Sequence, residues 1–283
     1  MKIPKGKIVA IGGNEDKGTL PVRVKANQFK QQHQFDHGIL KRIHDELHGL
    51  GTRIEVVTTA TSTPEVAGKI YTDAFLMLGC DNVGVLPIQC PQDANRPDYL
   101  ERLMHTDAVM FTGGDQQRIT AAFQGSEALN IIKTRYLHED KFLISGTSAG
   151  AMALSGIMIN GYVETTPLLK GMVELTSGLD ILDKIIIDTH FVNRRRIPRL
   201  VEAIASNPTH IGIGLGEDTG ILITGNDFIE TIGSGLVIVI DGRKLVANNY
   251  ESIGTGEALC VENLIMHILP RGRSYHITSG KFV

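Results

Sequence analysis

Short runs of apolar residues alternate with stretches of helical periodicity over about the first two thirds of the chain. Most runs are rich in β-branched residues, lack polar alternation and end in glycine or a polar cluster. Such runs are typical of strands covered by helices on both faces, and their alternation with helical stretches is the βαβ pattern of a parallel sheet. The predicted strands span residues 7–11, 53–58, 83–87, 108–112, 142–145, 185–188 and 211–215.

The remaining part of the chain has a different pattern. Its apolar runs are short, closely spaced and joined by turn signals at 225–227 and 241–242, which predict antiparallel hairpins attached to one end of the sheet. These runs span residues 220–224, 228–232, 236–241 and 244–246. Because the sequence has no internal repeat and no linker, we expect a single α/β domain over residues 1–283, with a mainly parallel central sheet.

The composition narrows the class of protein. Of the 283 residues, 42% are apolar, and 28 Lys and Arg nearly balance 31 Asp and Glu, which argues against a broad surface for nucleic acid. The three cysteines are far apart and lack C-x-x-C spacing, as expected for free thiols in a reducing compartment. The basic start is followed by an apolar run too short for a signal peptide or a membrane span. We therefore expect a cytoplasmic protein that binds neither nucleic acid nor a membrane.

The strongest chemical signal is the G-x-S-x-G motif at residues 146–150. It follows the strand predicted at 142–145 and precedes a small-residue helix start at 151–154, so Ser148 is expected at a sharp turn between strand and helix. Such a turn exposes the hydroxyl above the sheet edge and directs the Ala149 amide toward the position of an oxyanion. Ser148 is therefore the candidate nucleophile of a serine hydrolase, with a chance occurrence of the short motif as the alternative.

A serine nucleophile needs a base, and His190 is the candidate. It follows the run at 185–188, at the carboxyl end of a predicted strand, where open α/β sheets build their sites. A core histidine bonded to the backbone is the alternative. Asp188 and Glu217 are both candidates to orient the imidazole, and spacing does not choose between them. The order Ser, His, with the Glu candidate last, argues against an ordinary esterase or lipase.

Two glycine pairs follow other predicted strands. Gly113 and Gly114 suit close approach of the backbone to a ligand and a second oxyanion donor, or else a plain tight turn. Gly12 and Gly13 would suit a phosphate in a non-catalytic binding protein, although the G-x-G-x-x-G fingerprint is missing.

Taken together, several segments resemble the cyanophycinase and peptidase E family of serine peptidases, in order over nearly the whole chain. The main ones are GGNEDK at 12–17, FTGGDQ at 111–116, GTSAGA at 146–151, DTHF at 188–191 with Arg194, Arg196 and Arg199, and GLGEDT at 214–219. The resemblance implies a three-layer, glutamine-amidotransferase-like (flavodoxin-like) fold. It also implies that Glu217 completes a triad with Ser148 and His190. The mechanism expected of such a triad needs no metal and no cofactor.

The family's substrate, cyanophycin, is a poly-aspartate chain with an arginine on each β-carboxyl, and its hydrolysis releases β-Asp-Arg dipeptides. Guanidinium forks bind carboxylates bidentately, which fits this polymer, whereas a solvated helix face is the alternative for the arginines. The resemblance also implies a homodimer. The groove residues that it implies are Gln116, Asp188, Arg194, Arg196 and Arg199.

Departures from the family pattern leave the substrate open. Gly216 stands where the family usually has aspartate, and Arg195 and Pro198 replace residues that are more often small. Adjacent Gln116 and Gln117 are also interchangeable by position. The alternative function is an isoaspartyl or α-aspartyl dipeptidase of the same family.

A stripe of four histidines falls at helical spacing along one edge of an amphipathic segment. The histidines are His33, His37, His44 and His48, beside the apolar residues Phe35, Ile39, Ile43 and Leu47. Two i, i+4 histidine pairs could bind a transition metal. Because no carboxylate or cysteine completes a familiar ligand set, we expect a solvated helix face instead.

Overall fold

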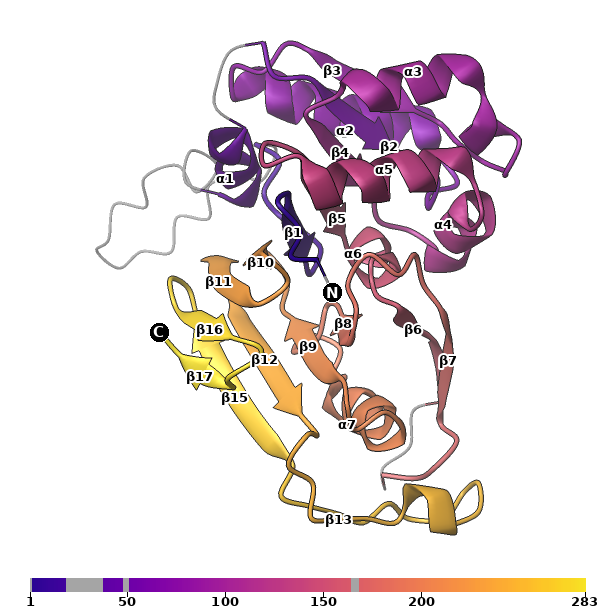
Figure 1. The fold of residues 1–283 in the computed structure, drawn as a ribbon, viewed down its shortest axis with the longest axis vertical. Coiled ribbons are helices and arrows are strands. Elements are labelled where there is room, and N and C mark those ends of the chain that lie inside the picture. Colours follow the sequence, from indigo (N-terminus) through magenta and orange to yellow (C-terminus); the bar gives the residue numbers. More distant parts are fainter. Residues whose placement is uncertain (1, 19–37, 48–50, 164–167) are drawn as a thin grey trace, which may run out of the picture.

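The computed structural model describes residues 2–18, 38–47, 51–163 and 168–283, within which the largest sheet has nine strands (Figure 1). Their order is β17-β16-β11-β10-β1-β5-β4-β2-β3. Five neighbouring strands run parallel, which confirms the predicted fold class. They are β1 (Lys7–Ile11), β2 (Ile54–Val57), β3 (Val83–Leu86), β4 (Ala108–Phe111) and β5 (Leu143–Thr147).

Antiparallel strands extend this sheet beyond β1. The predicted hairpin forms from β10 (Thr219–Thr224) and β11 (Phe228–Gly233), with positive φ at Gly225 and Asn226 in the connecting turn. Positive φ at these two residues matches the right-handed twist of the paired strands. β16 (Ser274–His276) and β17 (Lys281–Phe282) complete the edge.

Two strands predicted for the parallel sheet lie elsewhere. β8 (Ile185–Asp188) and β9 (Ile211–Leu215) pair with each other in a second sheet, which continues through β12 (Leu236–Asp241) to β15 (Ile265–Pro270). The prediction of one sheet for all seven runs is therefore wrong. Their apolar composition indicates burial on both faces but carries no information on which strand lies alongside.

The prediction of a strand at 244–246 is also wrong. After β12, the amide of Arg243 donates to Oδ1 of Asp241 (2.9 Å) and the amide of Leu245 donates to the carbonyl of Gly242 (3.0 Å). The chain turns here, and the next strand is β13 (Ala247–Asn248), which pairs with β14 (Val261–Glu262). A short 3₁₀ helix, η3 (Tyr250–Ser252), lies between these two strands.

Helices cover both faces of the parallel strands, giving three layers (Figure 1). Along β1, Val9 and Ile11 pack with α1 and α2, whereas Ile8 and Ala10 face the cluster that includes α3, α4 and α5. This alternation is the two-residue period of a strand. The helices are α1 (Ile39–Glu46), α2 (Pro64–Met77), α3 (Pro97–His105), α4 (Gln116–Phe123) and α5 (Glu127–His138), with a short η2 (Asp93–Asn95).

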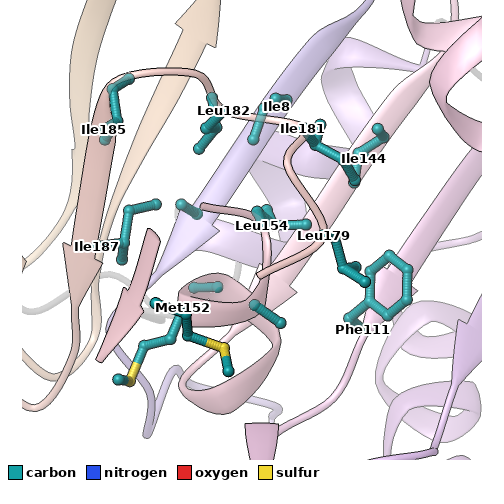
Figure 2. Close-up of a cluster of buried hydrophobic side chains, with 14 of the residues drawn as sticks. Ile8, Phe111, Ile144, Met152, Leu154, Leu179, Ile181, Leu182, Ile185 and Ile187 are labelled. Carbon is teal, nitrogen blue, oxygen red and sulfur yellow. The ribbon is translucent and has the colours of Figure 1, made fainter. Parts of the chain in front are cut away.

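A buried apolar cluster joins the central sheet to the second sheet (Figure 2). The short helix α6 (Ala149–Ala153) follows β5, and its Met152, with Leu154 just beyond, belongs to the same cluster as Ile185 and Ile187 of β8. Close packing resists small displacements. The cluster therefore holds the end of β5 and the end of β8 in fixed relative positions.

The sequence pattern did not predict the antiparallel pair β6 (Ile157–Tyr162) and β7 (Val173–Ser177), which follows α6. The last helix, α7 (Ile197–Ser206), packs on β9, where a side chain at Gly212 would lie 2.8 Å from Leu200. Within the described ranges, no helix has the length and apolarity needed to cross a membrane.

The histidine stripe is only partly visible. His33, His37 and His48, with Phe35, lie outside the described residues. In α1, Ile39 and Ile43 are buried, as helical spacing predicts, but His44 is not on a solvated face, because only 15% of its side chain is exposed. Within the parts of the chain that the structure describes, no group of three or more His, Cys, Asp or Glu could hold a metal ion.

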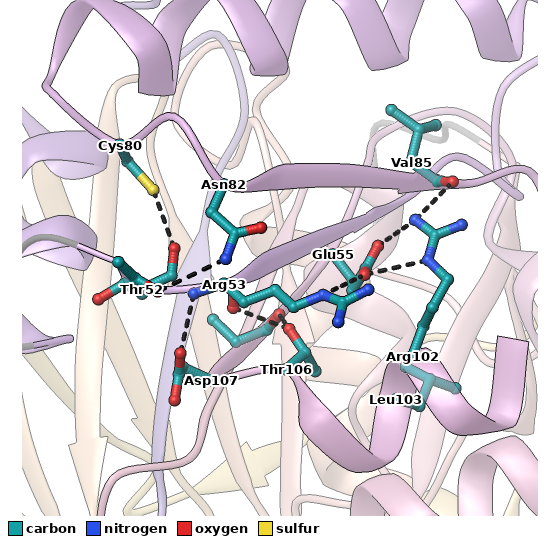
Figure 3. A network of polar contacts seen from close by, with 12 residues as sticks. Thr52, Arg53, Glu55, Cys80, Asn82, Val85, Arg102, Leu103, Thr106 and Asp107 are labelled. Carbon is teal, nitrogen blue, oxygen red and sulfur yellow. Dashed lines mark hydrogen bonds and ion pairs between the residues drawn. The ribbon is translucent and has the colours of Figure 1, made fainter.

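A fully buried carboxylate ties the outer parallel strands to α3 (Figure 3). Glu55 of β2 accepts from Nε of Arg53 and Nε of Arg102, each at 3.1 Å, and Arg102 also donates to the carbonyl of Val85 in β3 (3.1 Å). A buried charge is tolerated only when it is paired and hydrogen-bonded. Glu55 therefore depends on its two guanidinium partners.

Replacing Arg102 by methionine is expected to lower the free energy of unfolding by about 3 kcal/mol, because it leaves a buried charge undercompensated. Urea unfolding measures the change. Lys69→Met, which removes an exposed pair with Asp73 on α2, serves as the control and should cost less than about 1 kcal/mol. Equal losses of unfolding free energy in the two variants would show that the buried charge of Glu55 does not depend on Arg102.

Candidate active site

Ser148 lies at the turn between β5 and α6, with φ 51° and ψ −115°. Its amide donates to the carbonyl of Ile11 in β1 (2.9 Å). The flanking glycines permit this turn: a Cβ on Gly150 would lie 2.3 Å from the carbonyl oxygen of Phe111, and one on Gly146 would lie 2.6 Å from the carbonyl of Gly150. The G-x-S-x-G motif thus has the strand-turn-helix setting expected from the sequence.

Ser148, His190 and Glu217 form a continuous series of hydrogen bonds. Oγ of Ser148 lies 2.9 Å from Nε2 of His190, and Nδ1 of His190 lies 2.8 Å from Oε1 of Glu217. Because a carboxylate only accepts, Nδ1 carries the proton and Nε2 is free to accept from the serine hydroxyl. His190 is 7% exposed, but its ring is bonded to side chains and not to the backbone.

Of the two candidate acids, Glu217 is the one beside the imidazole. The hydrogen bond from His190 is the main reason why the pKa of Glu217 is lowered, so the carboxylate is ionised at neutral pH. Asn193 also donates to its Oε2 (3.3 Å), and sequence reasoning had missed this contact.

Asp188 does not line the pocket, contrary to the prediction. It is fully buried, and its oxygens accept from the Thr189 amide (2.7 Å) and from Nε of Arg199 (2.5 Å). Arg196 lies 3.4 Å from the same carboxylate. Asp188 therefore acts on the pocket through the arginines that it holds.

A pocket of about 370 Å³ opens beside Ser148. Its polar and charged side chains come from β6, α4, the turn between β5 and α6, the segment between β8 and α7, and α7 itself. The lining residues are Gly114, Gln116, Ser148, Ala149, Met152, Asn160, Gly161, Tyr162, Thr189, His190, Arg194, Arg196 and Arg199. Among the described residues, no carboxylate side chain lines it.

The two adjacent glutamines have different surroundings. Gln116 lines the pocket, and its Nε2 donates to the carbonyl of Ile159 (3.1 Å). Gln117 does not line the pocket, and its amide is bonded to the side chain of Asn160. Asn160 and its neighbours in β6 were not expected at the site, since no motif marks them.

The three arginines are held to different degrees. Arg199 is buried and paired with Asp188, while Arg196 donates to the carbonyl of Thr189 (2.7 Å). Burial, with the neighbouring charge of Arg199, lowers the pKa of Arg196 to about 10. Arg194 is exposed, and no ion pair within the described part of the chain engages it. The pocket therefore presents unneutralised positive charge.

The predicted oxyanion residues lie around the serine. A Cβ built on Gly113 would lie 3.9 Å from Oγ of Ser148, so this residue lies close to the nucleophile candidate. Gly114 and Ala149 both line the pocket.

Gly13 lies against the histidine ring. Its φ is +101°, and an added Cβ would lie 2.6 Å from Nε2 of His190. The glycine pair after β1 is therefore explained by close approach of the imidazole, which the sequence motif alone did not indicate.

Replacing Gly13 by alanine is expected to displace the imidazole and lower kcat by about 10²-fold, the loss typical of a 1 Å misplacement of a catalytic group. Steady-state kinetics measure the loss. Gly79→Ala is the control, because Gly79 also has positive φ (+87°) but an added Cβ there meets no atom within 4 Å. If Gly13→Ala retained full kcat, Gly13 would not constrain His190.

The chain is similar in sequence to known peptidases. The model of peptidase family S51 matches residues 26–231. The cyanophycinase of Synechococcus elongatus is 32% identical over 273 residues, covering 96% of this chain and 80% of the relative. The cyanophycinase of Geminocystis herdmanii is 29% identical over 274 residues, covering 96% and 94%.

Two solved structures share the fold. A peptidase from an acI-B1 Actinobacterium superimposes with a TM-score of 0.65 at 18% identity, over 98% of this chain and 99% of that one. A putative peptidase E protein from Listeria monocytogenes superimposes with a TM-score of 0.54 at 16% identity, over 81% and 99%. At these identities the likeness concerns the fold alone.

Proposed function

The chain belongs to peptidase family S51, and from this premise we propose that it is a serine exopeptidase that hydrolyses cyanophycin to β-Asp-Arg dipeptides. The observation that carries the proposal is the hydrogen-bonded series from Ser148 through His190 to Glu217, of which Ser148 and His190 line a basic pocket. Such a series is the arrangement by which a serine hydroxyl becomes a nucleophile.

In the proposed mechanism, Oγ of Ser148 attacks the backbone carbonyl of the substrate while Nε2 of His190 takes its proton. Glu217 keeps the imidazole in the productive tautomer and stabilises the imidazolium that forms. Backbone amides of Ala149 and of the Gly113–Gly114 turn stabilise the oxyanion. His190 then protonates the leaving amine, and water activated by the same imidazole releases the acyl group from Ser148.

The charge of the pocket supports a substrate that presents carboxylate groups to it. Each arginine attached to the cyanophycin backbone carries a free α-carboxylate, and guanidinium groups bind carboxylates in bidentate geometry. Arg194 is exposed and unpaired within the described residues, so it is available for this contact. A carboxylate would also relieve the repulsion between Arg196 and Arg199. The substrate's guanidinium groups find no carboxylate among the described lining residues and extend into solvent.

Arg194→Met is expected to raise KM by about tenfold, because it removes one charge-assisted contact worth roughly 1.5 kcal/mol. Steady-state kinetics on cyanophycin measure the change, and kcat should stay close to the wild-type value. The adjacent Arg195 offers a matched control: it is exposed but does not line the pocket, so Arg195→Met should leave KM unchanged. Equal KM values for both variants would remove Arg194 from the substrate site.

The function itself is tested by incubating the protein separately with cyanophycin and with β-Asp-Arg, followed by mass analysis of the products. Release of β-Asp-Arg from the polymer supports the proposal. Release of free aspartate and arginine from the dipeptide, with the polymer intact, would instead support an isoaspartyl dipeptidase.

A further inference from the structure

Three consecutive carbonyl groups at the end of β1 accept hydrogen bonds from the three segments that carry Ser148, His190 and Glu217. Ile11 accepts from the amide of Ser148 and Gly12 from the amide of His190, each at 2.9 Å. Gly13 accepts from the amide of Asp218, next to Glu217, also at 2.9 Å. One short segment, 11–13, thus sets the relative positions of all three segments, and we call it the template segment.

The template segment continues into Glu15, a carboxylate that is 3% exposed. Its Oε2 accepts from Oγ1 of Thr147 (2.7 Å), and its Oε1 accepts from the hydroxyl of Tyr71. Nζ of Lys17 lies 3.1 Å from Oε1 and compensates the charge. Thr147 is the residue immediately before Ser148, so Glu15 connects the template segment directly to the serine turn.

The stability of the fold alone does not account for a buried carboxylate at position 15. Burying a carboxylate carries a large desolvation cost, and an apolar side chain at this position would avoid it. Tyr71 comes from α2, and burial raises the pKa of its phenol well above the usual value, so it remains a donor. Three donors from three parts of the chain therefore converge on one carboxylate behind the serine turn.

We infer that Glu15 is a positioning residue for Ser148: by binding the side chain of Thr147, it fixes the strained serine turn against the template segment, which also binds the backbone amide of His190. This inference rests on the proposed function, because it assumes that Ser148 is the nucleophile. It assigns a role to the GGNEDK motif beyond the contact of Gly13 with the histidine ring. A catalytic group displaced by about 1 Å loses roughly 10² in rate, so small shifts of this turn have large effects.

Glu15→Gln is the test. A glutamine has one acceptor oxygen where the carboxylate serves three donors, so the bond to Thr147 or to Tyr71 is lost. We expect kcat on cyanophycin to fall by about 10- to 100-fold while KM changes by less than about twofold. The rate at which diisopropyl fluorophosphate modifies Ser148 should fall in parallel, because this reagent makes no use of the arginines of the pocket.

The matched control is Glu55→Gln. Glu55 is also a fully buried carboxylate held by cationic side chains, but it lies near the amino end of β2 (Figure 3). Both substitutions should lower the melting temperature, whereas only Glu15→Gln should lower kcat and the labelling rate. If the two variants lost stability alike and both kept wild-type kcat, Glu15 would be a structural residue and the inference would be wrong.

Thr147→Val provides a second variant should Glu15→Gln fail to fold, because it removes one hydroxyl at almost constant shape. We expect the same selective loss of kcat, and in the double variant the two losses should not add, as for groups that act through one contact. Wild-type kcat in Thr147→Val would overturn the inference. Tyr136→Phe, which removes a buried phenol bonded to Asn226 (2.5 Å), is the control and should keep full kcat.

Ser148→Ala separates the two proposals. If this variant hydrolysed cyanophycin at the wild-type rate, the proposed function would fail, and the inference with it. If it were inactive while Glu15→Gln and Thr147→Val both kept wild-type kcat, only the inference would fail.

Discussion

Replacing Ser148 by alanine is expected to lower kcat by about 10⁶-fold, the size of loss seen when a serine nucleophile is removed. The substitution deletes Oγ, which lies 2.9 Å from Nε2 of His190 and is the proposed attacking atom. The backbone of the turn is held by the bond from the Ser148 amide to Ile11 and by packing, so the protein should stay folded. Activity on cyanophycin and urea unfolding, measured on the same preparation, check both statements.

Ser145→Ala is the matched control for this prediction. Ser145 lies three residues earlier, is 1% exposed, and donates to the carbonyl of Val9 (3.1 Å). Its loss should cost about 1 kcal/mol of stability and leave kcat unchanged. Near-wild-type activity in Ser148→Ala, or an equal loss of kcat in both variants, would contradict the assignment of the nucleophile.

The second large effect is expected for Glu217→Gln, which should lower kcat by about 10⁴-fold, as when the acid of such a triad becomes an amide. Oε1 of Glu217 accepts from His190 and Oε2 accepts from Asn193. A glutamine can accept at only one of these positions, so its NH₂ group faces a donor and disfavours the tautomer in which Nδ1 carries the proton. The variant should bind substrate normally, and steady-state kinetics would resolve the unchanged KM from the lowered kcat.

Glu230→Gln controls for the general effect of removing a carboxylate. The side chains of Glu230 and Glu217 are 29% and 30% exposed, and Glu230 is also hydrogen-bonded, to Arg42. It lies on β11, and its replacement should leave kcat unchanged. A Glu217→Gln variant with kcat within about tenfold of the wild-type value would mean that the acid is not needed to orient the imidazole.

The positions of the candidate catalytic residues could be predicted because each follows a recognisable apolar run. The runs that end before Ser148, His190 and Glu217 form β5, β8 and β9, and strand ends are where such sheets place functional groups. The G-x-S-x-G motif added the turn geometry, since its glycines are required by the close approach of neighbouring backbone. Apolar runs followed by polar residues therefore predicted where the candidate catalytic residues lie.

Other features could not be read from the sequence because they depend on contacts between distant segments. The same apolar composition fits β8 in either sheet, so its pairing with β9 outside the central sheet was not predictable. The pocket wall from β6 carries Asn160 and Tyr162, which belong to no motif. The prediction that Asp188 lines the pocket is wrong, because this side chain is buried and paired with Arg199 of α7, a contact that depends on how α7 packs.

The claim on which all else depends is that Ser148 is the nucleophile, and covalent labelling tests it most directly. The protein is treated with diisopropyl fluorophosphate and the modified residue is located by peptide mass mapping. We expect one adduct, on Ser148, that forms in step with the loss of cyanophycin hydrolysis and forms far more slowly in His190→Ala. Complete inactivation with Ser148 unmodified, or an adduct on another residue that accounts for the lost activity, would contradict the assignment.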